Sequence, residues 1–67
     1  MTTTIKKILI ELEQLNSKIT KLENFIDSVS VNDITSYHKE LLILQLTIMK
    51  SYYSCLNLRL QDLIKDQ

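Results

Sequence analysis

The segment MKSYYSCLNLRL combines residue types that could bind an anionic molecule containing a nucleobase. Arg59 offers a fork of N–H donors that fits a phosphate or a carboxylate. Tyr52 and Tyr53 offer flat rings for stacking and hydroxyl groups for hydrogen bonds. Lys50 and Asn57 add a cation and an amide that could reach a phosphate and a base edge. This segment directly follows the uncharged run LLILQLTI, so its polar and aromatic side chains stand out.

The residues that could support catalysis or bind a metal are sparse. Cys55 and His38 are the single cysteine and the single histidine, which is too few for a four-ligand zinc site. Both lie in one expected helix, too far apart along it to pair as nucleophile and base. We expect Cys55 to be a small buried apolar residue. The chain has no glycine, so it has no glycine-rich phosphate loop. The sequence therefore predicts a binding protein without catalytic, metal or cofactor chemistry.

Length and charge favour an oligomer. A chain of 67 residues with one cysteine has neither a large core nor an internal disulfide, so association is the remaining source of stability. Eight basic and eight acidic residues give no net charge, which argues against a general nucleic-acid binder. The longest uncharged stretch is shorter than the roughly 20 residues that span a bilayer. No signal-peptide pattern is present at MTTTIKK, so we expect a cytoplasmic protein without a membrane partner.

The first half of the chain predicts one long helix over residues 3–28. Its apolar residues recur in steps of three and four, which is the pattern of a coiled-coil seam. The seam positions are Ile5, Ile8, Leu12, Leu15, Ile19, Leu22, Ile26 and Val29. Residues 29–33 favour a turn, with Asn32 or Asp33 as the N-cap of a second helix over residues 34–65.

The second helix carries two apolar stripes, and one first helix can cover only one of them. The first stripe is Leu42, Leu46, Met49, Tyr53, Leu56, Leu60 and Leu63. The second, a quarter-turn away, is Leu41, Leu44 (or Gln45), Ile48, Tyr52, Cys55 and Arg59. We therefore predict an all-α protein: an antiparallel two-helix hairpin, forming a single domain, that assembles into a homo-oligomeric helical bundle.

The candidate binding residues fall on two faces of this second helix. Lys50 and Asn57, seven residues apart, share one polar strip, and Tyr52 and Arg59 share a face on the opposite flank. One interpretation is a solvated surface, in which Arg59 pairs with a nearby aspartate and the tyrosines border the core. The other is a site between copies, where symmetry brings paired arginines and aromatic rings together around a ligand.

Two runs of sequence carry a family resemblance. KLENFIDS, a short turn and ELLILQLTIMKSYYSCLNLRL resemble the small phage proteins named after a crAss-like phage open reading frame. The informative positions are Phe25, Gln45, Tyr52 and Arg59. The resemblance implies a phage origin and a helical hairpin that oligomerises. In size and architecture the chain is also similar to phage sponges for nucleotide messengers, the helical anti-CBASS sponges and the anti-Thoeris protein Sequestin.

These likenesses imply a function in the host cytoplasm. Such a protein would sequester an immune second messenger, either a cyclic dinucleotide or an ADP-ribose derivative, in pockets between subunits. The alternative is a coiled-coil adaptor or structural oligomer, in which the second stripe docks a protein helix and no small molecule binds.

Overall fold

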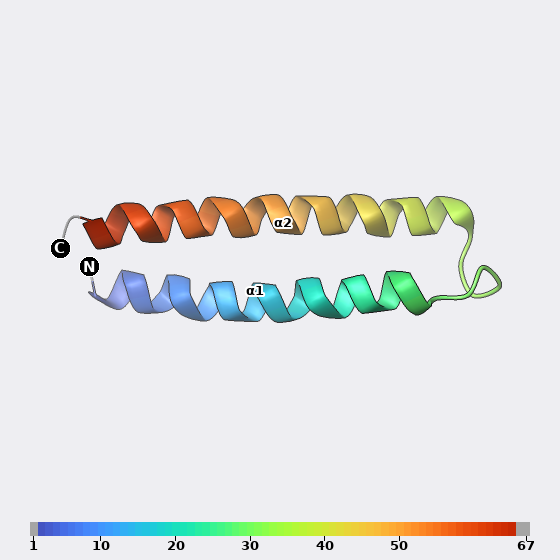
Figure 1. The fold of residues 1–67 in the computed structure, drawn as a ribbon, viewed down its shortest axis with the longest axis horizontal. Helices are drawn as coiled ribbons and strands as arrows, with labels where there is room; N and C mark the ends of the chain where they lie inside the picture. Colours follow the sequence, from blue (N-terminus) through green and yellow to red (C-terminus); the bar gives the residue numbers. More distant parts are fainter. Residues whose placement is uncertain (1, 66–67) are drawn as a thin grey trace.

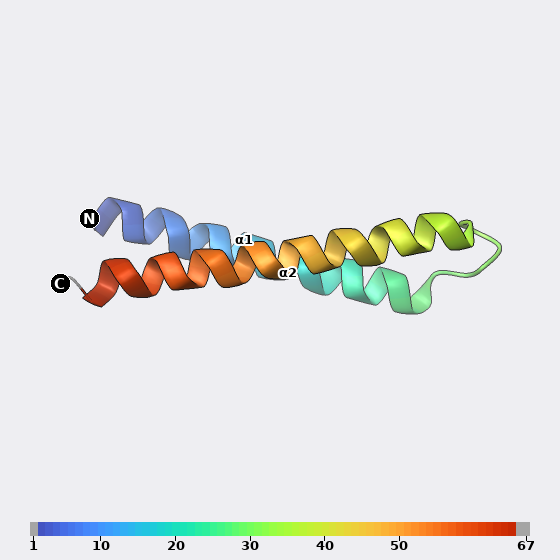
Figure 2. The ribbon, with the colours of Figure 1, turned by 90° about the horizontal axis from the view of Figure 1, so that it is seen from above.

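The computed structural model describes residues 2–65 and consists of two long helices. Helix α1 spans Thr2–Ser28 and helix α2 spans Ser36–Lys65. They lie side by side and run in opposite directions, so that the loop is at one end, and the start of α1 and the end of α2 are at the other (Figure 1). Viewed from above, they cross at a shallow angle (Figure 2), as helices packed through a coiled-coil seam do. The predicted helical hairpin is confirmed.

The interior of the hairpin is the seam that the heptad spacing predicts. The buried residues of α1 all belong to the predicted seam, and Leu56 and Leu60 are the buried residues of α2. Five further apolar residues pack against this cluster: Ile5, Leu46, Met49, Tyr53 and Leu63. Because residues three and four apart share a helix face, one stripe from each helix closes the core. Leu56, at its centre, has no exposed surface.

The loop covers residues 29–35 and is two residues longer than predicted. The predicted N-cap was wrong: neither Asn32 nor Asp33 begins α2, and Thr35 caps it instead. The Thr35 hydroxyl accepts a hydrogen bond from the His38 N–H at 3.0 Å, and its carbonyl accepts the Lys39 N–H at 3.0 Å. Asp33 instead donates its N–H to the Ser30 carbonyl at 3.0 Å, which closes a turn within the loop.

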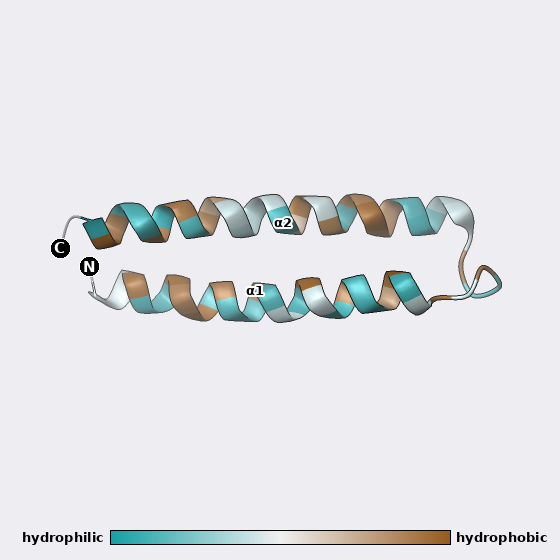
Figure 3. Ribbon diagram, in the orientation of Figure 1, coloured by the Kyte–Doolittle hydropathy of each residue, from teal (hydrophilic) through white to brown (hydrophobic). Residues whose placement is uncertain are grey.

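The second apolar stripe of α2 is exposed in the single hairpin. Leu41, Leu44 and Ile48 are 40%, 55% and 59% exposed, and Tyr52 is 44% exposed. Apolar colour consequently follows both helices along their length, interrupted by polar bands (Figure 3). Within residues 2–65, no helix is long and apolar enough to cross a membrane.

Candidate functional site

The predicted site residues lie on two sides of the seam. The Tyr52 flank is the side that carries Tyr52 and Arg59 from α2 and Glu11 from α1. The Lys50 flank is the side that carries Lys50 and Asn57 from α2, with Glu23 from α1. Positions 50 and 52 are two residues apart, which separates them by about 200° around a helix axis. Two hydrogen-bonded contacts between the helices, one on each flank, fix this division.

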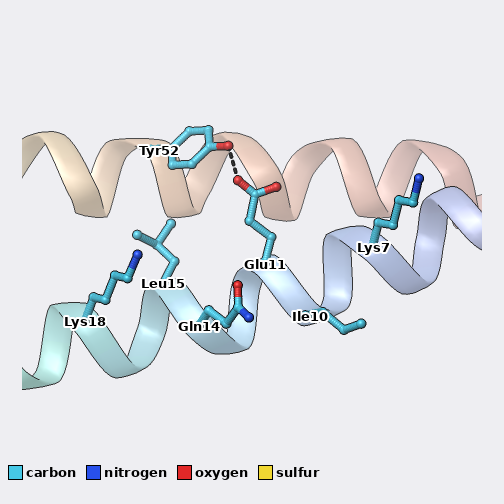
Figure 4. A pocket seen from close by; sticks show the side chains of 7 residues that line it. All are labelled: Lys7, Ile10, Glu11, Gln14, Leu15, Lys18 and Tyr52. Carbon is cyan, nitrogen blue, oxygen red and sulfur yellow. Dashed lines mark hydrogen bonds between the residues drawn. The ribbon is translucent and has the colours of Figure 1, made fainter.

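The contact on the Tyr52 flank is a hydrogen bond between the two helices. The Tyr52 hydroxyl donates to Oε2 of Glu11, as the close-up in Figure 4 shows. Glu11 is partly buried beside the seam, whereas the ring of Tyr52 stays partly exposed. The hydrogen bond therefore holds an aromatic face at the surface in a defined orientation.

A groove of about 440 Å³ lies along this flank, within the size range of small-molecule sites. Tyr52 borders it from α2, and the remaining lining residues come from α1: Lys7, Ile10, Glu11, Gln14, Leu15 and Lys18. In Figure 4 the side chains of Lys7, Glu11 and Lys18 rise toward α2. Ile10 and Leu15 contribute apolar surface, and the polar lining groups are two ammonium groups, an amide, a carboxylate and a phenol.

The electrostatics of the Tyr52 flank favour an anion. Lys7 and Lys18 line the groove, and Arg59 lies on the same face of α2 as Tyr52, seven residues further along. Within residues 2–65, none of these three cations is in an ion pair. Glu11 is the carboxylate that lines the groove. Cations outnumber carboxylates here although the whole chain has no net charge.

The hydrogen bond to Glu11 also affects the protonation of Tyr52. The Glu11 carboxylate accepts the phenol proton's hydrogen bond and so raises the pKa of Tyr52 above its usual value. Partial burial and the negative charge of Glu11 act in the same direction, while the positive charge of Arg59 lowers that pKa. The raised pKa extends to higher pH the range over which the Tyr52 hydroxyl donates this hydrogen bond.

The Lys50 flank is separate from this groove. The Lys50 ammonium pairs with Glu23 Oε2 at 2.9 Å, with both side chains about half exposed. Asn57, seven residues further along α2, is exposed on the same face. Tyr53 belongs to neither flank, because its ring is partly buried and packs against the core. A single hairpin thus brings Tyr52 and Arg59 to one side and leaves Lys50 and Asn57 on the other.

Comparison with known protein families assigns this chain to one of them. A family model described as Sequestin matches residues 2–62, which include all of α1, most of α2 and every residue of the groove. The chain belongs to the Sequestin family. This confirms the predicted likeness to Sequestin, and the likeness to the crAss-like phage pattern stays a prediction. Neither a curated protein nor a solved structure matches the chain.

For this Sequestin family member, the sequence pattern missed the four polar residues that line the groove from α1. Lys7, Glu11, Gln14 and Lys18 follow one another in steps of four, three and four, so they share a face of α1 beside the seam. That spacing was visible in the sequence. The spacing does not indicate which flank of α2 lies next to these α1 residues. The structure shows that it is the Tyr52 flank, because the Tyr52 hydroxyl donates a hydrogen bond to Glu11.

The environment of Cys55 differs from expectation. We expected a small buried residue, but the Cys55 thiol is free and exposed on the second stripe of α2. The physical reason is that α1 covers only the first stripe of α2. Within residues 2–65, no group of three or more histidine, cysteine, aspartate or glutamate side chains could hold a metal ion.

Proposed function

We propose that this protein is a phage-encoded, non-enzymatic binding protein that sequesters a nucleotide immune messenger, either a cyclic dinucleotide or an ADP-ribose derivative. Sequestration in the host cytoplasm would lower the free messenger concentration by mass action and silence the effector that responds to it. The family supports a sequestering role, since its model carries the name Sequestin and matches most of the chain.

The observation that carries the proposal is the groove on the Tyr52 flank. Lys7, Lys18 and Arg59 are available to phosphates, because none of them is paired within the described residues. The exposed ring of Tyr52 offers a stacking face beside them. An aromatic face next to unpaired cations fits a molecule that contains both a base and a phosphate.

We further propose that the site is completed between copies of an antiparallel hairpin. The second stripe, including Leu41, Leu44 and Ile48, adjoins Tyr52 and Arg59 on the same face of α2. Covering this stripe with a second copy would bury its apolar side chains and bring two Tyr52 flanks together. The groove would then be enclosed, which strengthens each interaction between a cation and a phosphate. Lys50 and Asn57 would reach the ligand only from a neighbouring copy.

Four single substitutions test this assignment by titration calorimetry with cyclic di-GMP and ADP-ribose. Lys7→Ala should weaken nucleotide binding roughly tenfold, since it removes a charged hydrogen-bond donor. Lys6→Ala removes the same charge one residue earlier, about 100° around the helix, and should leave binding unchanged. Arg59→Ala should abolish binding while the oligomer persists, and Tyr52→Ala should weaken it. Equal affinities for all four variants and the wild type would contradict the assignment.

The exposed stripe also supports a second candidate, a coiled-coil protein–protein adaptor. In that case Leu41, Leu44 and Ile48 would receive a helix of another protein. Native mass spectrometry separates the two functions. A sequestering protein gains nucleotide mass as a closed homo-oligomer, whereas an adaptor ignores nucleotides and forms a stoichiometric complex with a protein from infected cells.

A further inference from the structure

The Tyr52 flank favours an anion through its cations, but it also contains the negatively charged carboxylate of Glu11. It lies in the same strip of α1 as Lys7 and Lys18, at steps of four and seven residues, and lines the same groove. Its position is fixed rather than free, because Oε2 accepts the hydrogen bond from the Tyr52 hydroxyl (Figure 4). A bound anion would therefore lie close to a fixed negative charge as well as to the cations.

A fixed negative charge repels anionic ligands to different extents. The Coulomb energy between two charges is proportional to their product. A ligand with several charges close together therefore loses more binding free energy to this repulsion than a ligand with isolated charges. A triphosphate concentrates its charge, whereas a phosphodiester carries one charge per phosphate. The groove excludes part of the solvent, since Glu11 is partly buried, and this reduces the screening of the repulsion.

We propose that Glu11 is a specificity-determining residue that rejects nucleoside triphosphates and admits nucleotides whose phosphates each carry a single charge. This inference rests on the proposed function and identifies the charge pattern that the site selects. The hydrogen bond alone does not require a negative charge at this position, since a neutral amide also accepts from Tyr52, although more weakly than a carboxylate. Specificity of this kind uses repulsion of the wrong ligand rather than extra attraction of the right one.

The test is Glu11→Gln, which keeps the acceptor for Tyr52 and removes only the charge. Binding of ATP, inorganic triphosphate, cyclic di-GMP and ADP-ribose is measured by calorimetry on the wild type and the variant. We expect Glu11→Gln to raise affinity for ATP and triphosphate roughly tenfold more than affinity for cyclic di-GMP or ADP-ribose. The matched control is Glu40→Gln, which removes the same charge from an exposed position of α2 outside the groove and should leave the ratio unchanged.

The outcomes distinguish this inference from the proposed function. If the affinity ratio is the same in Glu11→Gln and wild type, or if Glu40→Gln changes it equally, Glu11 has no selective role. If wild type binds neither cyclic di-GMP nor ADP-ribose, the proposed function loses its support for these ligand classes. In that case, tighter triphosphate binding by Glu11→Gln than by wild type would still support the selective role of Glu11. Unchanged triphosphate binding would refute it.

Discussion

Leu56→Ala should destabilise the hairpin more than any comparable change on an exposed face. Within residues 2–65, Leu56 is the one large side chain with 0% exposure, and it packs in a cluster with Leu12 and Leu60. The lost transfer free energy and the cavity left behind together cost about 3 kcal/mol. A domain of this size has a free energy of unfolding of roughly 3–10 kcal/mol, so the loss is a large fraction of it. The melting temperature should fall by about 15 °C.

Leu58→Ala is the matched control, because Leu58 lies two residues away in the same helix and is 65% exposed. Both substitutions replace leucine by alanine, so their effects on helix propensity are the same. Thermal unfolding is followed by far-ultraviolet circular dichroism at equal protein concentrations. Leu58→Ala should change the melting temperature by a few degrees or less. Similar shifts for Leu56→Ala and Leu58→Ala would refute the assignment of the seam.

Three further predictions address the cap, the hydrogen bond of Tyr52 and the exposed stripe. Thr35→Ala should cost about 1 kcal/mol in chemical denaturation, since it removes the hydroxyl that accepts the His38 N–H; an unchanged midpoint would contradict the cap. Because the pKa of Tyr52 is raised in the folded protein, its hydrogen bond stabilises the fold below pH about 10 and is lost as pH rises through the raised value. Ultraviolet titration should therefore show one phenol ionising earlier in Glu11→Gln than in wild type, and coincident curves would contradict the contact. Ile48→Glu should reduce the oligomer mass measured by light scattering, whereas Leu58→Glu, also on an exposed position of α2, should not.

The seam was predictable because its periodicity is a local property of each helix. Ile8, Leu12 and Leu15 follow steps of three and four that only a helix places on one face. The start of α2 was less predictable. Asn32, Asp33 and Thr35 are all capable N-caps, and the choice depends on where the loop lets α2 meet the seam of α1. Thr35 caps α2 although Asn and Asp are on average better N-caps than Thr, so local preference alone did not identify the cap.

The candidate site was predictable only in part, for a similar reason. The spacing of Tyr52 and Arg59 shows that they share a face, and the spacing of Lys50 and Asn57 shows that they share another. Which residues of α1 border each face depends on how the two helices pair. Glu11 was identified through its hydrogen bond to Tyr52, and Lys7 and Lys18 through the groove beside it. Contacts between helices carry information that the periodicity of one helix lacks.

Whether the protein sequesters a nucleotide messenger is best measured by native mass spectrometry of the purified protein with a mixed panel of cyclic dinucleotides and ADP-ribose derivatives. Sequestration in sites between copies predicts one closed homo-oligomer that gains the mass of one nucleotide per site. Arg59→Ala should lose this binding without a change in oligomer mass. A defined oligomer that retains no member of the panel would contradict messenger sequestration. Nucleotide binding that is equally strong in Arg59→Ala would contradict the Tyr52 flank as its site.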